Sequence, residues 1–152
     1  MAIQFVPGQV AVGDNSPVGP TVLSGPVKDV QTKVVKLSSA NFGTSAVNTL
    51  VAALPADATI LEMKLWVKTQ LAGGGITAAT VNIGTSSGGT QFASAFNSFG
   101  TAGAMSQVTP ITNIVQNYQV PLTGDIPIFV GGTATTGNPT SGELYLMVYY
   151  VR

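Results

Sequence analysis

Residues 58–71 read ATILEMKLWVKTQL, and this stretch decides the fold class. Apolar and polar residues alternate along it, which is the pattern of a half-buried β-strand. One face carries the apolar residues Leu61, Met63, Leu65 and Val67. The other face carries Glu62, Lys64, Trp66 and Lys68. Leu61, Leu65 and Lys68 also have helical spacing, but the strict period of two and the glycines at 73–75 favour a strand that ends in a turn.

The segments on either side of this strand are β-like as well. ITAATVNIG at 76–84 is predicted to return beside it as the second strand of a hairpin. QFASAFNSF at 91–99 is predicted to form a short helix or an irregular crossing, and residues 132–142 a loop of small residues. Further strands are predicted at 30–37, 105–111, 113–122, 126–131 and 143–152.

The last predicted strand, ELYLMVYYVR, is apolar on both faces, so we expect it in the middle of a sheet with both sides covered. Seven to nine short strands with Gly/Pro turns and no convincing long helix predict an all-β sandwich, jelly roll or barrel. Without an internal repeat of fixed period, a propeller or solenoid is not expected. We expect one β domain over residues 28–152.

Charged residues make up 8% of the chain, whereas a typical soluble domain has about 25%. Six basic residues are too few for a nucleic-acid surface or a polybasic membrane anchor, and no apolar run approaches the length of a membrane span. Cysteine and histidine are absent from the sequence, which excludes disulfides, thiolate zinc sites and imidazole-based catalysis. We therefore expect neither nucleic acid nor membrane as a partner.

The carboxylates give no pattern typical of catalysis. Asp57 and Asp125 lie in turn contexts, where aspartate usually caps backbone groups, and Glu62 is expected to form a cross-strand ion pair. GTSSGGT at 84–90 lacks the Gly-Lys-Ser/Thr ending of a phosphate-binding loop and is interpreted as a β-turn. We expect no catalytic residue, no metal site and no cofactor, so the chain is predicted not to be an enzyme.

Residues 1–27 differ from the rest, since four prolines and four glycines argue against regular structure. The segment nevertheless contains many apolar residues. This favours an extended arm that binds a neighbouring subunit, and the alternative is a flexible tail. The predicted contact residues of this arm are Ile3, Phe5, Val6, Val10 and Val12.

A separate set of aromatic residues is assigned to a subunit interface or the core, and the alternative role for these residues is to stack on sugars. The interface candidates are Trp66, Tyr145 and Tyr149.

Within residues 58–100, a strand leads through a Gly-rich turn into a second strand that ends VNIGTS (81–86), and a small-residue loop and the step ASA (93–95) follow. This pattern resembles that of small structural proteins of tailed bacteriophages. The resemblance implies a jelly-roll-like antiparallel β-sandwich that decorates or cements capsids, or that serves in head fibres and tail tips. It also implies a homotrimer, because trimers are common among such modules.

Composition agrees with permanent assembly, because obligate interfaces hide apolar surface that a low-charge monomer would expose. The function expected is a capsid decoration or cement protein on the exterior of the virion, bound to the major capsid protein or another virion protein. The alternative is a receptor- or glycan-binding tip domain of a phage fibre. A self-assembling pilus or surface-layer subunit is a minor third possibility.

Overall fold

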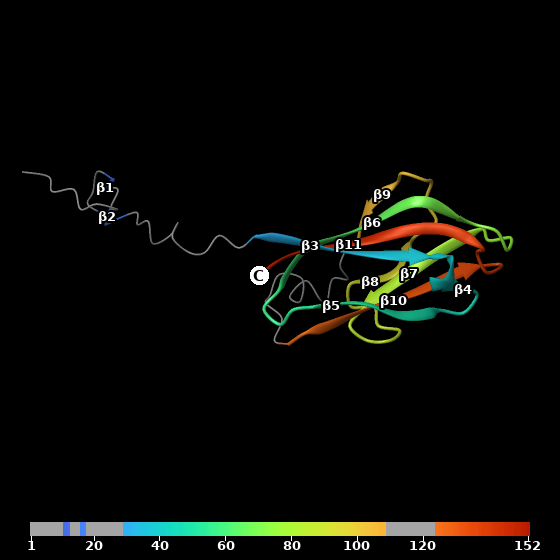
Figure 1. Cartoon of the computed structure of the whole chain (residues 1–152), viewed down its shortest axis with the longest axis horizontal. Helices are drawn as coiled ribbons and strands as arrows, with labels where there is room; N and C mark the ends of the chain where they lie inside the picture. Colours follow the sequence, from blue (N-terminus) through green and yellow to red (C-terminus); the bar gives the residue numbers. More distant parts are fainter. Residues whose placement is uncertain (1–10, 13–15, 18–28, 109–123) are drawn as a thin grey trace, which may run out of the picture.

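A computed structural model describes residues 11–12, 16–17, 29–108 and 124–152 of the chain. Within residues 29–108 and 124–152, the strands form two β-sheets that pack face to face (Figure 1). The four-stranded sheet contains, in spatial order, β3 (Val30–Ser38), β11 (Ser141–Val151), β6 (Thr59–Ala72) and β9 (Met105–Gln107). The five-stranded sheet contains β4 (Phe42–Gly43), β5 (Val47–Leu54), β10 (Ile126–Thr135), β7 (Ala78–Gly84) and β8 (Ala93–Asn97). A 3-10 turn, η1 (Ser39–Asn41), follows β3, and β1 (Ala11–Val12) pairs with β2 (Ser16–Pro17).

The strand order identifies the type of sandwich. One sheet reads β3-β11-β6-β9 and the other reads β5-β10-β7-β8, with β4 also beside β10. Eight of these nine described strands, all but the short β4, form two four-stranded layers joined by long crossings, which is a jelly roll. The pairs are antiparallel except for the short parallel contact of β4 with β10. The predicted jelly-roll-like antiparallel β-sandwich is therefore confirmed.

Strand β11 lies in the centre of the four-stranded sheet, between β3 and β6, as predicted. Its residues Leu144, Leu146 and Val148 are fully buried against the other sheet. The alternate residues Tyr145 and Met147 are only half-buried. The described residues thus cover one side of this strand, whereas the sequence predicted cover on both sides.

Leu61 does not lie on the predicted apolar face, because β6 contains a β-bulge at this residue. Tyr149 lies opposite Glu62 and Tyr150 lies opposite Ile60, so Leu61 is the extra residue of the bulge. Because the extra residue shifts the alternation, Ile60 points into the core and is fully buried, whereas Leu61 is 44% exposed. Met63 and the apolar residues that follow keep the predicted face.

The predicted hairpin between 58–71 and 76–84 is wrong. Strand β7 pairs with β10 and β8 in the five-stranded sheet, whereas β6 belongs to the four-stranded sheet. The connection between them crosses from one sheet to the other, and Gly73, Gly74 and Gly75 have φ angles of +86°, +62° and +73°. Three successive positive φ values suit glycine alone, because it carries no Cβ. A hairpin and a crossing have the same apolar alternation, so the sequence did not distinguish them.

A second crossing, residues 136–140 between β10 and β11, packs against the first. The Thr136 hydroxyl donates to the Gly75 carbonyl at 2.6 Å, and the Thr140 N–H donates to the Ala72 carbonyl at 2.9 Å. The two backbones are so close that a Cβ on Gly74 would come within 1.9 Å of the Asn138 carbonyl oxygen. The two crossings are thus hydrogen-bonded to each other and packed together at one end of the sandwich.

Three other segments differ from their predicted boundaries or lie outside the description. Residues 91–99 contain a strand, β8, in place of the predicted helix or irregular crossing. Strand β10 continues to Thr135, into the predicted loop. The predicted strand at 113–122 lies outside the described residues. In the described part of the chain, no helix is long and apolar enough to cross a membrane.

Candidate functional site: the outer face of the four-stranded sheet

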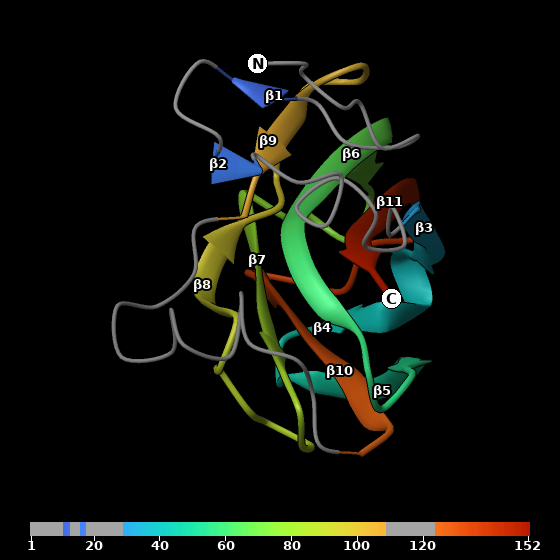
Figure 2. The same cartoon turned by 90° about the vertical axis from the view of Figure 1, so that its left-hand side faces the viewer.

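The four-stranded sheet has one side that faces away from the core, called here the outer face. Figure 2 shows β9, β6, β11 and β3 side by side in this sheet, and the register places their alternate residues on that side. The outer face carries Thr32, Val34, Lys36, Glu62, Lys64, Trp66, Met105, Glu143, Tyr145, Met147 and Tyr149. Val34 and Met105 are 55% and 56% exposed, although both are large apolar residues. This side of the sheet thus combines exposed apolar and aromatic side chains with charged ones.

Aromatic rings occupy the middle of the outer face. Trp66 on β6 lies opposite Tyr145 on β11, and the two rings stack with centroids 5.5 Å apart. Tyr149 lies four residues beyond Tyr145 on β11, and its hydroxyl donates to Met147 Sδ at 3.7 Å. The fold therefore brings together the three residues assigned to a subunit interface, Trp66, Tyr145 and Tyr149. Their role in an interface stays a hypothesis.

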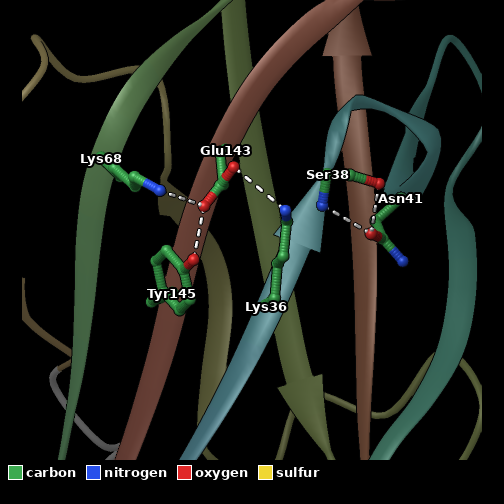
Figure 3. A network of polar contacts seen from close by, with 6 residues as sticks. All are labelled: Lys36, Ser38, Asn41, Lys68, Glu143 and Tyr145. Atoms are coloured by element: carbon green, nitrogen blue, oxygen red, sulfur yellow. Dashed lines mark hydrogen bonds and ion pairs between the residues drawn. The ribbon is translucent and has the colours of Figure 1, made fainter.

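Glu143 joins three neighbouring strands on the same face (Figure 3). Its Oε2 lies 3.0 Å from Lys36 Nζ on β3, and its Oε1 accepts a hydrogen bond from Lys68 Nζ on β6 at 2.9 Å. The Tyr145 hydroxyl donates to the same Oε1. Sequence reasoning missed this network, because Lys36, Lys68 and Glu143 are far apart in the chain and only the strand register brings them together.

These donors stabilise the ionised form of the Glu143 carboxyl. The hydrogen bond from Tyr145 is the largest cause, followed by those from Lys68 and Lys36, and together they lower the pKa of Glu143 from 4.5 to about 2. The carboxylate in turn raises the pKa of Lys68, chiefly through their hydrogen bond. The bond from Tyr145 also holds that ring in place beside Trp66.

We expect the Glu143→Gln variant to lose pH-dependent stability. A carboxyl whose folded pKa lies below its unfolded value stabilises the fold above the unfolded pKa, and that contribution disappears as the pH falls through the folded pKa. The variant should be less stable than wild type at pH 7, and the difference should shrink between pH 4.5 and about 2. Urea denaturation followed by circular dichroism at a series of pH values measures it.

Glu62→Gln is the matched control, since Glu62 lies on the same face and forms a single ion pair within the described residues, with Lys64 at 2.9 Å. It should change stability at pH 7 less than Glu143→Gln does, because one surface ion pair contributes little. A constant difference between Glu143→Gln and wild type from pH 7 to pH 2 would contradict the assigned role of the carboxylate.

Charges on the outer face are already paired within the chain. Lys36 and Lys68 contact Glu143, and Lys64 contacts Glu62 and lies 5.2 Å from the centre of the Tyr149 ring. Glu62 was expected to pair across strands, but its partner is on its own strand. A surface whose charges are paired can be covered without leaving a buried charge unpaired, which would be costly.

The remaining candidates from the sequence have structural partners. In the 84–90 loop, the N–H groups of Thr85, Gly88 and Gly89 donate to Gln91, Asn48 and Ser86, so a phosphate would find these donors occupied. Asp125 accepts the N–H of Ala56 at 2.9 Å, and Asp57 pairs with Arg152. No group of three or more carboxylates is placed to hold a metal ion in the described part of the chain.

The five residues predicted for the arm are divided between the parts of the chain inside and outside the described residues. Ile3, Phe5, Val6 and Val10 lie outside the described residues. Val12 belongs to β1, where it lies opposite Ser16 of β2.

Comparisons with known proteins identify the fold but no sequence family. No protein-family model matches the chain, and no curated protein matches it. A chain of the cyanophage Pam1 capsid asymmetric unit is similar in structure, with a TM-score of 0.57 and 18% identity over 84% of this chain and 87% of that one. A chain from the capsid of Ralstonia phage GP4 gives a TM-score of 0.55 and 18% identity, over 84% and 88%. A chain from the acidic stable capsid structure of Helicobacter pylori bacteriophage KHP30 gives 0.50 and 13%, over 83% and 94%.

These likenesses cover most of both chains in each case. They confirm, at the level of the fold, the resemblance to phage structural proteins that the sequence between residues 58 and 100 indicated.

Proposed function

We propose that this chain is a viral structural protein that binds the capsid surface as an oligomer and stabilises the shell. It is a decoration or cement protein, its place is the exterior of the virion, and it has no catalytic activity. Its partners are further copies of itself, as a homotrimer, and the major capsid protein or another virion protein.

The observation that carries the proposal is the outer face of the four-stranded sheet. Val34 and Met105 are more than half exposed there, around the stacked pair of Trp66 and Tyr145. Exposed apolar patches rimmed by polar groups mark interaction sites on proteins, and aromatic residues and methionine are enriched at interfaces. The lysines and glutamates of this face pair with each other, which suits a surface that is permanently covered. The shared fold with chains of phage capsid structures supports a place in the virion.

The same aromatic residues favour a second candidate, a glycan-binding tip domain, because sugars stack on exposed rings. Two contacts weigh against it. Tyr145 stacks on Trp66, and Lys68 Nζ lies 5.8 Å from the centre of the Tyr145 ring. A sugar would have to compete with both neighbours for that ring.

Met105→Glu tests the proposed use of the outer face. Met105 is on the short edge strand β9 opposite Trp66, so the change should leave the core intact. Burying a methionine contributes about 1.5–3 kcal/mol, and placing a charge there adds a desolvation cost. We expect at least a tenfold loss of affinity for particles that lack the protein, measured by co-sedimentation over a range of concentrations.

Leu50→Glu is the control, because Leu50 is equally exposed (58%) but lies on β5 of the other sheet. It should bind particles like wild type. Wild-type binding by Met105→Glu would overturn the proposed use of this face. Quenching of Trp66 fluorescence by a simple sugar, without particle binding by either protein, would support the glycan-binding candidate instead.

A further inference from the structure

Strand β3 is a long sheet edge with an unusual degree of exposure. Among the described residues it pairs with β11 and with no other strand. It runs for nine residues in continuous register, without a proline or a bulge. Residues Val30–Val34 are exposed on both faces of the sheet, and Figure 2 shows the strand at the margin of the sheet beyond β11. Proteins usually protect such an edge, because its free backbone groups pair readily with another strand.

The free backbone groups of β3 belong to its even-numbered residues. The Ser38 N–H donates to Asn41 Oδ1 at 2.8 Å, so it points away from β11 (Figure 3). The direction of backbone N–H and C=O groups alternates along an antiparallel strand. Thr32, Val34 and Lys36 therefore present their N–H and C=O groups to the open side.

We propose that β3 pairs antiparallel with β3 of a second copy, around a two-fold axis at Val34. A three-fold interface cannot contain this two-fold contact, so the contact joins copies that belong to two different homotrimers. Val34 is the midpoint of the strand, so every position of β3 lies opposite a position of the second copy, and only the Ser38 N–H stays with Asn41 Oδ1. Thr32 then lies opposite Lys36 of the second copy, and Val34 lies opposite its counterpart. Each of these is a pair of residues whose backbone groups face one another, and such a pair exchanges two hydrogen bonds. The two four-stranded sheets become one continuous sheet.

Charge favours this register over its neighbour. Around Val34, Lys33 lies opposite Val35 of the second copy, and Lys36 lies opposite Thr32. A two-fold axis one position earlier would place Lys33 directly opposite its own counterpart, and like charges directly opposite each other destabilise a sheet. Pairing around Val34 also brings together two valine side chains, each 55% exposed in the single chain.

The edge at the other side of the same sheet is less suited to pairing. Strand β9 has three residues, which offer few backbone groups. Strand β8, at the margin of the five-stranded sheet, has a register shift against β7, and Ala95 has a φ of +47°. Irregularities of this kind disrupt the backbone hydrogen-bond ladder and make an edge strand less able to pair with another strand. A second copy is also the simplest occupant of β3, since a two-fold contact closes on itself.

Introducing a charge at Val34, on the two-fold axis, tests the proposal with the full chain in the absence of particles. Val34→Lys and Val34→Glu each place two like charges opposite one another, so each variant alone should have half the mass of the wild-type assembly in light scattering. An equimolar mixture of the two should recover the wild-type mass, because lysine then faces glutamate. Leu50→Glu, with the same exposure on the other sheet, should keep the wild-type mass.

Amide hydrogen exchange supplies a second readout that does not depend on a variant. In the wild-type assembly the Thr32, Val34 and Lys36 amides should exchange at least tenfold more slowly than in Val34→Glu, whereas the amides of Lys33 and Val35, which point to β11, should change little. The proposal is overturned if the wild-type mass persists in both variants, or if the even-numbered amides exchange equally fast in wild type and variant.

Discussion

Replacing Leu146 by alanine is expected to lower the free energy of unfolding by about 2–5 kcal/mol. Leu146 is fully buried in the central strand β11, between Val35 of β3 and Leu65 of β6, which are themselves buried. Its side chain thus lies where three strands and the opposite sheet meet, and the cavity left by truncation cannot be filled from solvent. The loss is a large part of the roughly 5–15 kcal/mol by which a domain is stable.

Urea denaturation at constant protein concentration measures this loss, because oligomerisation would otherwise change the apparent stability. Leu50→Ala is the control. Leu50 is 58% exposed, and such surface changes stay within about 0.5 kcal/mol. If the two variants unfolded at the same urea concentration, Leu146 would not lie in the core as described.

Deleting residues 2–24 is expected to leave the sandwich folded and to abolish attachment to the particle, or to weaken it sharply. If the arm binds a neighbour, Ile3, Phe5, Val6, Val10 and Val12 each contribute on the order of 1.5–3 kcal/mol when fully covered. Ordering a segment costs about 1–2 kcal/mol per residue in backbone entropy, and the four prolines of residues 1–27 reduce that cost because they are already restricted in the free chain.

Co-sedimentation with particles that lack the protein compares the deleted and the full-length chains. A full-length variant with Ile3→Ser and Phe5→Ser is the matched control for length, and it should bind more weakly than wild type and more strongly than the deletion. Equal occupancy by the deleted and full-length chains would show that residues 2–24 are a tail and would remove one support for the cement function.

The sequence predicted the strands whose residues alternate strictly, and it failed where the alternation is interrupted or ambiguous. Residues 63–67 kept their predicted face because nothing disturbs the period of two there. Leu61 did not, because a bulge adds one residue and exchanges the faces beyond it. The partner of β7 was also beyond prediction, since a crossing and a hairpin bury the same residues.

The candidate site shows the same division. Residue type alone selected Trp66, Tyr145 and Tyr149, and the fold brings them onto one face. The Glu143 network was not predictable, because it depends on which residues of β3 and β6 lie beside β11. The solvent exposure of β3, which supports its proposed pairing, also depends on the assembled sheet. The local sequence VQTKVVKLS (30–38) contains no pattern that predicts it.

In the four-stranded sheet, β11 lies between β3 and β6 but follows both of them in the sequence, and this order constrains how the protein is made. While β11 is still being synthesised, β3 and β6 have no strand between them to hold them together. Their apolar faces stay exposed until residues 141–151 leave the ribosome, so the sheet forms only after β11 has been synthesised. Non-local strand pairing is slow, and unpaired edges are prone to aggregation meanwhile. A ribosome that stops before residue 141 therefore releases a chain that lacks an inner strand of this sheet, and such a product is not expected to accumulate in folded form.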